Sequence, residues 1–297
     1  MGLNGMALVL NEEQVMLRDA ALGFLSENAT LSHLRKMRDS DSASPYNMNV
    51  WKKMVEMGWA GIAIDEGHGG LGYGFKGLGI LLEQTGRHLS ASPLHSAISV
   101  GATLIDKLGN DIQKAKMLRE ISSGSFLPTL GLQESEVHKP TSISTKAEKT
   151  STGFRLSGNK VMVMDAHACD NFIIIARTSG ASEDSVGLTA FMVSEKAAGV
   201  SVAITPMVDS RNYSRIKLSN VEVEDSDVLG EVGGAWDGLS ETLDVANICL
   251  AAELLGLSEE AFQRTVKYLQ ERKQFGSFIR SFQGLQHRAA EIFAELE

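Results

Sequence analysis

The residues best suited to ligand chemistry form a short run between two amphipathic stretches near the end of the chain. Residues 271–276 read ERKQFG, and Phe282 and Gln283 follow; we call residues 271–283 the corner. An exposed Arg can bind a phosphate through two parallel hydrogen bonds, and a Gln can bond an adenine edge or a ribose. These residue types suit an anion-binding corner, while a helix end that simply faces solvent is the plainer alternative.

Other apparent motifs are better explained by structure than by chemistry. Residues 72–77 match GxGxxG, but a nicotinamide-binding turn directly follows a strand and needs an acidic residue about 20 positions later. No Asp or Glu stands between Glu83 and Asp106, which favours a glycine-rich turn between helices. The seven histidines form no HExxH pair or compact cluster, so no metal site is expected. Glu222 and Glu224 alternate with valines and are expected to face solvent from a strand.

Composition and charge restrict the class of protein. The 297 residues are 43% hydrophobic and 22% charged, and at roughly 100–200 residues per domain two or three domains are expected. The formal net charge of -9 argues against nucleic acid as a partner, because that binding needs a basic surface. No run approaches the roughly 18 apolar residues that span a bilayer, and no signal peptide is recognisable. Cys169 and Cys249 lack CxxC spacing and are expected to be free thiols in the cytoplasm.

Helical patterns dominate the first 127 residues. Asn11 and Gln14 have the spacing of a capping box at the start of the first helix. Further helices are expected over 45–58, 76–89 and 93–124. The pattern changes near Pro128, where short apolar or alternating runs separated by turn residues predict an antiparallel barrel or sandwich. Within it, 154–164 is expected to be a hairpin around 157–159.

Helical spacing returns after Gly234. One apolar stripe is expected from Ile248, Ala252, Leu255, Phe262, Val266 and Leu269. A second helix begins near Phe282 and runs to Glu297 without a stop signal. Two amphipathic helices cannot close a bundle alone, so we expect the natural protein to continue; packing of these helices on the rest of the chain or on another subunit is the alternative. The predicted class is α+β, with a helical domain (1–127), an antiparallel β-barrel domain (128–235) and the start of a helical bundle (236–297).

Three segments together resemble the acyl-CoA dehydrogenase family. Residues 271–276 with 282–287 (FQGLQH) are similar to the family's ERxxFG…FQ signature. Residues 58–72 (GWAGIAIDEGHGGLG) resemble its glycine-rich segment, and residues 83–93 (EQTGRHLSASP) the helix that follows it. The order of helical, strand-rich and helical regions also agrees, so the resemblance covers essentially the whole chain.

The resemblance implies a cofactor, a reaction and partners. FAD would lie between barrel and bundle, with its adenine end reaching a neighbouring subunit. The family removes the α-proton of an acyl-CoA thioester with a glutamate and transfers the β-hydride to the flavin, while hydrogen bonds to the thioester oxygen acidify the α-carbon. Electrons usually leave to an electron-transfer flavoprotein. The implied partners are an acyl-CoA, that flavoprotein, and further subunits in a homo- or hetero-oligomer such as a dimer of dimers.

The corner carries the family's flavin-contacting positions well. Arg272, Gln274, Phe282 and Gln283 match them, and Phe275 lies between them in the same signature. In the family this stretch often serves the FAD of the partner subunit. The resemblance therefore implies a role for the corner at a site shared between two chains.

The positions expected around the flavin ring depart from the family. The family's loop, roughly T-E-P-x-x-G-S-D, aligns with residues 133–140, which are one residue short and lack the GSD piece. Gln133 is left to bond the pyrimidine edge, with Ser135 beside it. Met162 and Met164 align with the W-I-T strand; Met162 can contact the ring as a thioether, but Met164 brings no hydroxyl. We call Gln133, Ser135, Met162 and Met164 the ring-side set.

The substrate side departs as well. The family's D-x-x-R aligns with residues 244–247, so Asp244 is kept while Asn247 replaces the ligand-facing Arg. The usual catalytic glutamate lies beyond Glu297 in the family's later helices. Neither Glu295 nor Glu297 matches it, and no catalytic base is assigned.

An intact corner beside an altered ring-side set favours a subunit of a heteromeric dehydrogenase. The resemblance is to paired enzymes that act on bulky CoA esters such as sterol side chains, and Arg272 and Gln283 would complete a partner's FAD site. A self-sufficient homo-oligomeric dehydrogenase is the alternative. The remaining hypotheses are a non-catalytic binding or scaffolding protein and a flavin monooxygenase or oxidase on the same fold.

Overall fold

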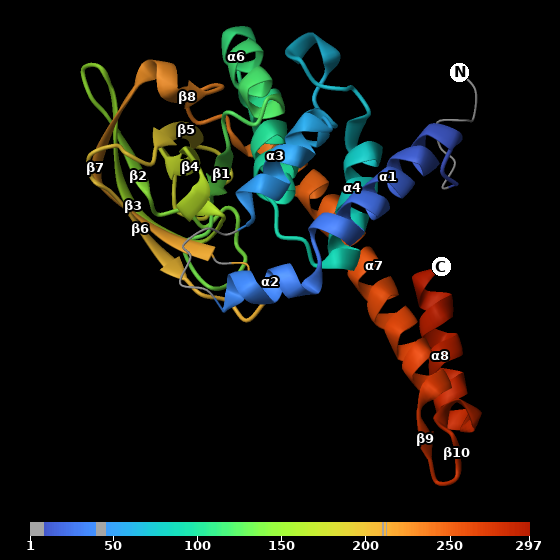
Figure 1. Ribbon diagram of the computed structural model, residues 1–297. Helices are drawn as coiled ribbons and strands as arrows, with labels where there is room; N and C mark the ends of the chain where they lie inside the picture. Colours follow the sequence, from blue (N-terminus) through green and yellow to red (C-terminus); the bar gives the residue numbers. More distant parts are fainter. Residues whose placement is uncertain (1–8, 40–45, 210, 212) are drawn as a thin grey trace.

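The chain folds into a helical N-terminal part, a curled central sheet and two C-terminal helices (Figure 1). The computed structural model describes residues 9–39, 46–209, 211 and 213–297. The predicted α+β class and the order of helices, sheet and helices are confirmed.

The N-terminal helices follow the predicted pattern, with one interruption. They are α1 (Glu12–Asn28), α2 (Leu31–Arg38), α3 (Met48–Glu56), α4 (Gly74–His88), α5 (Thr103–Leu108) and α6 (Asp111–Ser122), with the short 3₁₀ helices η2 (Trp59–Gly61) and η3 (Glu66–His68). A π-helix, η4 (Leu94–Ala102), precedes α5, so the helical stretch predicted over 93–124 consists of η4, α5 and α6. The capping box is confirmed: Asn11 Oδ1 accepts the Gln14 N–H at 2.8 Å, and Gln14 Oε1 accepts the Asn11 N–H at 3.0 Å.

The segment that formally matches GxGxxG is a turn leading into α4, as predicted. Gly69, Gly72 and Gly74 all have positive φ, which glycine adopts without the strain that a Cβ would bring. The Asp65 carboxylate accepts the Gly67 N–H at 2.7 Å and fixes the start of the turn.

The central sheet has eight strands in the order β6-β7-β3-β2-β4-β5-β8, with β1 added beside β4. The strands are β1 (Pro128–Gly131), β2 (Lys146–Lys149), β3 (Gly153–Met164), β4 (Asn171–Arg177), β5 (Leu188–Ser194), β6 (Val200–Thr205), β7 (Tyr213–Glu224) and β8 (Val228–Leu229). It curls around an apolar cluster of its own, while a second cluster fills the space between sheet and helices. In β7, Val221 and Val223 are buried and Glu222 and Glu224 exposed, so the predicted alternation is confirmed.

Two details of the predicted sheet are wrong. The sheet is mixed rather than antiparallel, because β1 and β2 both pair with β4 in parallel. The continuous apolar run of β4 is buried on both faces, as in parallel sheets, and this signal was available in the sequence. Residues 154–164 belong to the single strand β3 and do not form a hairpin. Gly158 lies at a β-bulge in this strand. A Cβ on it would lie 2.7 Å from the Cα of Thr145, so the glycine allows the backbone of Thr145 to come close rather than forming a turn.

The long helix α7 (Trp236–Glu271) links the body to the corner. Its first half packs on α4, η4 and α5, and its second half leaves the body together with α8 (Gln283–Leu296) (Figure 1). The start of a helix near Phe282 is thus confirmed. Where α7 crosses α4 the backbones touch: a Cβ on Gly86 would lie 1.9 Å from the Glu253 carbonyl oxygen, and one on Gly256 would lie 1.8 Å from the Glu83 carbonyl oxygen.

The buried face of α7 differs from the predicted one. Ile248, at the start of the predicted stripe, is 69% exposed, and Leu255 is also exposed. The buried residues are Leu239, Thr242, Ala246, Cys249, Glu253 and Gly256. Because the backbones of α4 and α7 touch, only small or specifically paired side chains fit between them, and hydrophobicity alone selects the wrong face.

Candidate functional site

The corner is built as a short hairpin between α7 and α8. The strands β9 (Lys273–Gln274) and β10 (Ser277–Phe278) pair antiparallel, and η7 (Ile279–Ser281) leads into α8. Phe275 (φ 53°) and Gly276 (φ 79°) form the two-residue turn, which requires positive φ at both positions. The predicted helix end near this glycine is confirmed, since α7 ends at Glu271 and the hairpin turn with Gly276 follows.

The aromatic side chains of the corner face solvent. Phe275 is 91% exposed, and its ring meets that of Phe282 edge-on at 6.2 Å. Phe278 lies between two cations, with the Lys273 ammonium 4.6 Å and the Arg280 guanidinium 5.2 Å from its centroid. An apolar surface this open beside positive charge is typical of a surface that another molecule covers.

The polar side chains of the corner have unused hydrogen-bonding capacity. In the part of the chain that the structure describes, the Arg272 guanidinium and the amides of Gln274 and Gln283 have no side-chain partner, and all three residues are exposed. Arg272 has its backbone fixed, since its N–H donates to Tyr268 and its carbonyl accepts from Ile279. The corner therefore presents a positioned cation and two amides that suit a phosphate and a heteroaromatic edge.

The loop after β1, which carries Gln133 and Ser135, bonds to itself. The Gln133 amide nitrogen lies 2.7 Å from His138 Nδ1, and its oxygen accepts the Lys139 N–H at 3.4 Å. The Ser135 hydroxyl donates to the Val137 carbonyl at 3.1 Å. Both candidate side chains are thus engaged within their own loop.

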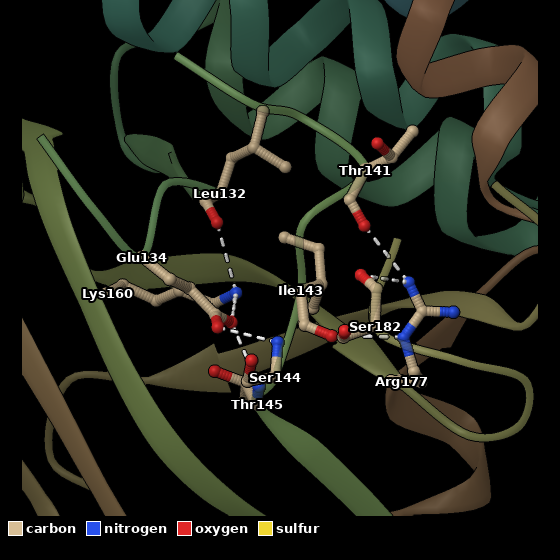
Figure 2. A network of polar contacts seen from close by, with 9 residues as sticks. All are labelled: Leu132, Glu134, Thr141, Ile143, Ser144, Thr145, Lys160, Arg177 and Ser182. Atoms are coloured by element: carbon tan, nitrogen blue, oxygen red, sulfur yellow. Dashed lines mark hydrogen bonds and ion pairs between the residues drawn. The ribbon is translucent and has the colours of Figure 1, made fainter. Parts of the chain in front are cut away.

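A buried ion pair between Lys160 and Glu134 holds this loop in place (Figure 2). Lys160 is fully buried, and its Nζ donates to the Leu132 carbonyl at 3.1 Å and to Glu134 Oε1 at 2.7 Å. The Glu134 carboxylate also accepts the N–H groups of Ser144 (2.6 Å) and Thr145 (3.0 Å). Burial lowers the pKa of Lys160 to about 8, with Glu134 opposing the shift. Burial works to raise the pKa of Glu134, but Lys160 together with the hydrogen bonds from Thr145 and Ser144 outweighs it and the pKa is lowered.

A second buried cation ties down the far side of the same loop. The Arg177 guanidinium, at the end of β4, is held by carbonyl oxygens at 2.8–3.3 Å. The acceptors are Thr141, Ile143, Ser179, Ser182, Asp184 and Val186. Figure 2 shows Thr141, Ile143 and Ser182 around it. Loop 141–143 and loop 179–186 are therefore fastened to one side chain.

The two methionines of the ring-side set differ in position. Met162 sits in a β-bulge with φ 53° and is 42% exposed. Met164 ends β3, accepts the Thr129 hydroxyl on its carbonyl at 2.7 Å, and lines a cavity between the sheet and α7. Met164 is therefore the member of the ring-side set that a ring bound in this cavity would meet.

A cluster of charges that sequence patterns did not reveal lies at that cavity, with Arg211 and Glu253 in its lining and Asp165 and His95 buried nearby. Arg211 forms an ion pair with Glu253 of α7, and their side chains are 22% and 10% exposed. The Asp165 carboxylate accepts the Ser96 hydroxyl at 2.6 Å, and burial raises the pKa of Asp165. His95 is also buried; burial, then Arg211, lowers its pKa to about 4. The only signal in the sequence was Glu253 inside an apolar helical segment.

The structure does not bring the candidate residues into one place within the chain. The corner lies at the outer end of the α7–α8 projection, whereas the ring-side set lies in β3 and in the loop after β1 (Figure 1). Asp244 and Asn247 are both exposed on α7, and neither lines the cavity beside Met164. Among the described residues no group of His, Cys, Asp and Glu could hold a metal ion, and no described helix could cross a membrane.

Comparison with known proteins identifies the family to which this chain belongs. The profile "Acyl-CoA dehydrogenase, N-terminal domain" matches residues 11–125, and "Acyl-CoA dehydrogenase, C-terminal domain" matches residues 234–297. A 3-(aryl)acrylate reductase of Clostridium sporogenes is 30% identical over 86% of this chain and 69% of its own length. This chain belongs to the acyl-CoA dehydrogenase family.

Further relatives agree with that assignment. A probable short/branched chain specific acyl-CoA dehydrogenase of Dictyostelium discoideum is 29% identical over 97% of this chain and 70% of its own length. A solved variant of the Tcur3481-Tcur3483 steroid ACAD is 30% identical, with a TM-score of 0.83 over 96% of this chain and 74% of that chain. The family consists of flavin-dependent oxidoreductases that act on CH–CH groups, and its cofactor is FAD.

The two groups of residues that the sequence predicts to bind FAD suit that cofactor unequally. The corner fits, because Arg272, Gln274 and Gln283 keep free donors suited to the phosphates and adenine. The loop with Gln133 and Ser135 does not, because its side chains are already bonded within the loop.

Proposed function

We propose that this chain is a subunit of an oligomeric acyl-CoA dehydrogenase and that its corner contacts FAD held mainly by a neighbouring subunit. In this proposal Arg272 binds a phosphate of the cofactor, Gln274 and Gln283 bond its polar edges, and Phe275 and Phe282 cover its apolar surface. The neighbouring subunit supplies the surroundings of the flavin ring.

The observation that carries the proposal is the exposure of the corner. Arg272 and Gln283 have no side-chain partner among the described residues, and Phe275 is 91% exposed. Exposed aromatic groups beside a free guanidinium gain most from a ligand or partner that covers them. The ring-side set of the same chain lies in β3 and in the loop after β1, away from the corner, so a site completed by two chains explains both positions (Figure 1).

The wider assignment follows the family. The reaction is the α,β-dehydrogenation of an acyl-CoA thioester, with electrons passed to an electron-transfer flavoprotein. The similarity to a steroid ACAD over 96% of this chain supports a bulky CoA ester as the substrate. Asp244 and Asn247, exposed on α7, are proposed to face substrate only in the assembled enzyme. The predicted domains, 1–127, 128–235 and 236–297, remain part of the proposal. A cytoplasmic location is also proposed, and the free, buried Cys169 and Cys249 support it.

The test is the FAD content of the full-length protein coexpressed with the products of neighbouring genes. Arg272→Ala should weaken FAD binding by about 10–100-fold, because a hydrogen bond to a charged group contributes about 1.5–3 kcal/mol. Arg264→Ala is the matched control: Arg264 lies on the same helix, is exposed and is paired with Glu260 at 2.7 Å. Retention of FAD by Arg272→Ala at the level of the control would refute the proposal that the corner contacts a neighbouring subunit's FAD.

A further inference from the structure

The helices α4 and α7 run side by side in the same direction and make contact at two successive levels. At the first, their backbones touch: a Cβ on Gly256 would lie 1.8 Å from the Glu83 carbonyl oxygen. At the second, further along both helices, the Arg87 guanidinium forms an ion pair with the Glu259 carboxylate. Arg87 is the penultimate residue of α4, so this ion pair marks the end of the contact between the two helices.

Beyond Glu259 the helix α7 extends away from the body of the protein. The structure describes every residue of α7 from 260 to 271, and none of them is buried. This half of the helix lies beside α8, where the rings of Phe262 and Phe293 are 6.4 Å apart (Figure 1). Arg272 lies roughly 20 Å farther along the axis than Glu259, at about 1.5 Å per residue. The corner therefore lies at the end of a long arm.

A long arm makes the position of the corner sensitive to the angle between α4 and α7. A tilt of about 10° at Glu259 would move Arg272 by roughly 3–4 Å, which is more than a hydrogen bond to a phosphate tolerates. The backbone contact at Gly256 fixes how closely the helices lie, and the ion pair, as a second point of contact nearer the corner, fixes their angle. The side chains of Arg87 and Glu259 are 16% and 29% exposed, and their partial shielding from water strengthens the attraction between them.

We infer that the Arg87–Glu259 ion pair is a positioning contact for FAD binding. It sets the direction in which α7 leaves α4 and thereby holds Arg272 within reach of the cofactor. Both residues act through Arg272 and do not touch FAD themselves. The inference rests on the proposed function, because Arg272 is the residue that the ion pair positions.

The first test is the FAD affinity of the full-length protein in its coexpressed complex. Arg87→Met should raise the Kd for FAD by about 3–10-fold, less than the loss expected for Arg272→Ala, because a displaced guanidinium keeps part of its attraction to a phosphate. Glu259→Gln should have the same effect. Arg264→Ala breaks a pair within α7 alone, so it should leave the Kd unchanged. A Kd in Arg87→Met and Glu259→Gln that equals the Kd of this control would overturn the inference.

Two combined variants separate positioning from a general loss of stability. Exchange of the charges, Arg87→Glu with Glu259→Arg, should restore the Kd to within about twofold, since the pair is re-formed with opposite polarity. Arg87→Met added to Arg272→Ala should weaken FAD binding by no more than about twofold beyond Arg272→Ala alone, because the residue to be positioned is absent. Losses that multiply in the second combination would contradict a role that acts through Arg272.

The direction of α7 is measured separately, in the full-length protein without cofactor. Spin labels on Ser151→Cys, between β2 and β3, and on Ser277→Cys, in the corner, report the distance from the body to the corner; both serines are exposed. Arg87→Met should shift or broaden the distance distribution by roughly 3 Å or more, whereas Arg264→Ala should not. An unchanged distribution in Arg87→Met would overturn the positioning role.

The two proposals fail in different ways. FAD retained by Arg272→Ala would defeat the proposed function and, with it, the purpose of the positioning contact. FAD lost by Arg272→Ala but bound normally by Arg87→Met and Glu259→Gln would overturn the positioning role alone.

Discussion

The loop at the ring side and the corner both carry candidate FAD residues, yet they differ in where their polar side chains find partners. Around the loop, the Gln133 amide bonds to His138 and Lys139, and Glu134 pairs with Lys160. These side chains have little hydrogen-bonding capacity left for a ligand. At the corner, Arg272 and Gln283 have positioned backbones and free side chains. The difference teaches that residues aligned with one cofactor can have two purposes: the loop's side chains stabilise this chain, and the corner, under the proposed function, serves a neighbour.

The largest effect expected from this comparison is on stability at the loop. Lys160→Met leaves the Glu134 carboxylate buried without its cation and should lower the free energy of unfolding by about 3–5 kcal/mol. Chemical denaturation measures it. Lys149→Met is the control, because the Lys149–Asp225 pair is exposed and should contribute at most about 1 kcal/mol. Equal losses of unfolding free energy in the two variants would show that the Lys160–Glu134 pair does not hold the loop in place.

The next effect is a pH dependence centred on His95. The pKa of His95 in the folded protein is about 4, below the ordinary 6.5, so the unfolded chain binds the extra proton between these values. Stability should fall as pH drops from about 6.5 to 4, by about 3 kcal/mol in total, because each pKa unit corresponds to 1.36 kcal/mol.

His95→Gln removes this titration and should flatten the fall in stability over that pH range. Asp165 titrates in both proteins, so the difference between them isolates His95. An unchanged slope in His95→Gln would mean that the buried cluster beside the cavity is not closed to water.

A smaller effect on stability is expected where α4 crosses α7, because this crossing sets the direction of α7 and therefore the position of the corner. Gly86→Ala places a Cβ 1.9 Å from the Glu253 carbonyl and should cost about 1–3 kcal/mol by overpacking. Gly79→Ala lies on the same helix, with Ala252 Cβ 3.8 Å away, and should stabilise by about 0.5–1 kcal/mol through helix propensity. Thermal unfolding of both variants separates these signs; a loss in both would contradict the contact at Gly86.

The smallest effect on stability is expected at the corner itself. Phe275→Ser and Gln283→Ala should change the free energy of unfolding of the lone chain by no more than about 0.5 kcal/mol, because both side chains are exposed. The same variants should reduce the FAD content of the coexpressed complex. A variant that loses stability in the lone chain would blur the contrast with the loop.

Sequence patterns sufficed for features set by neighbouring residues. The box of Asn11 and Gln14, the alternation in β7 and the end of α7 near Gly276 all follow from spacing within a few positions. The position of the corner outside the body could not be predicted from them, because it depends on how α7 leaves α4.

Features set by packing between distant segments were missed or wrong. The buried face of α7 was misjudged because Gly86 and Gly256 bring two backbones together, which hydrophobicity does not record. The partners Arg211 and Glu253 are separated by 42 positions, and no local pattern joins them. Lys160 stands out only as a charge inside the apolar strand β3, which is a signal of a buried partner but not of which one.

The central claim, that the corner completes a neighbour's FAD site, is tested most directly by the visible absorption spectrum of the full-length protein, purified alone and after coexpression with the products of neighbouring genes. The account predicts no flavin bands in the lone protein and a single FAD for each pair of chains on coexpression. Flavin bands in the lone protein, bleached anaerobically by an acyl-CoA, would contradict it and establish a self-sufficient dehydrogenase.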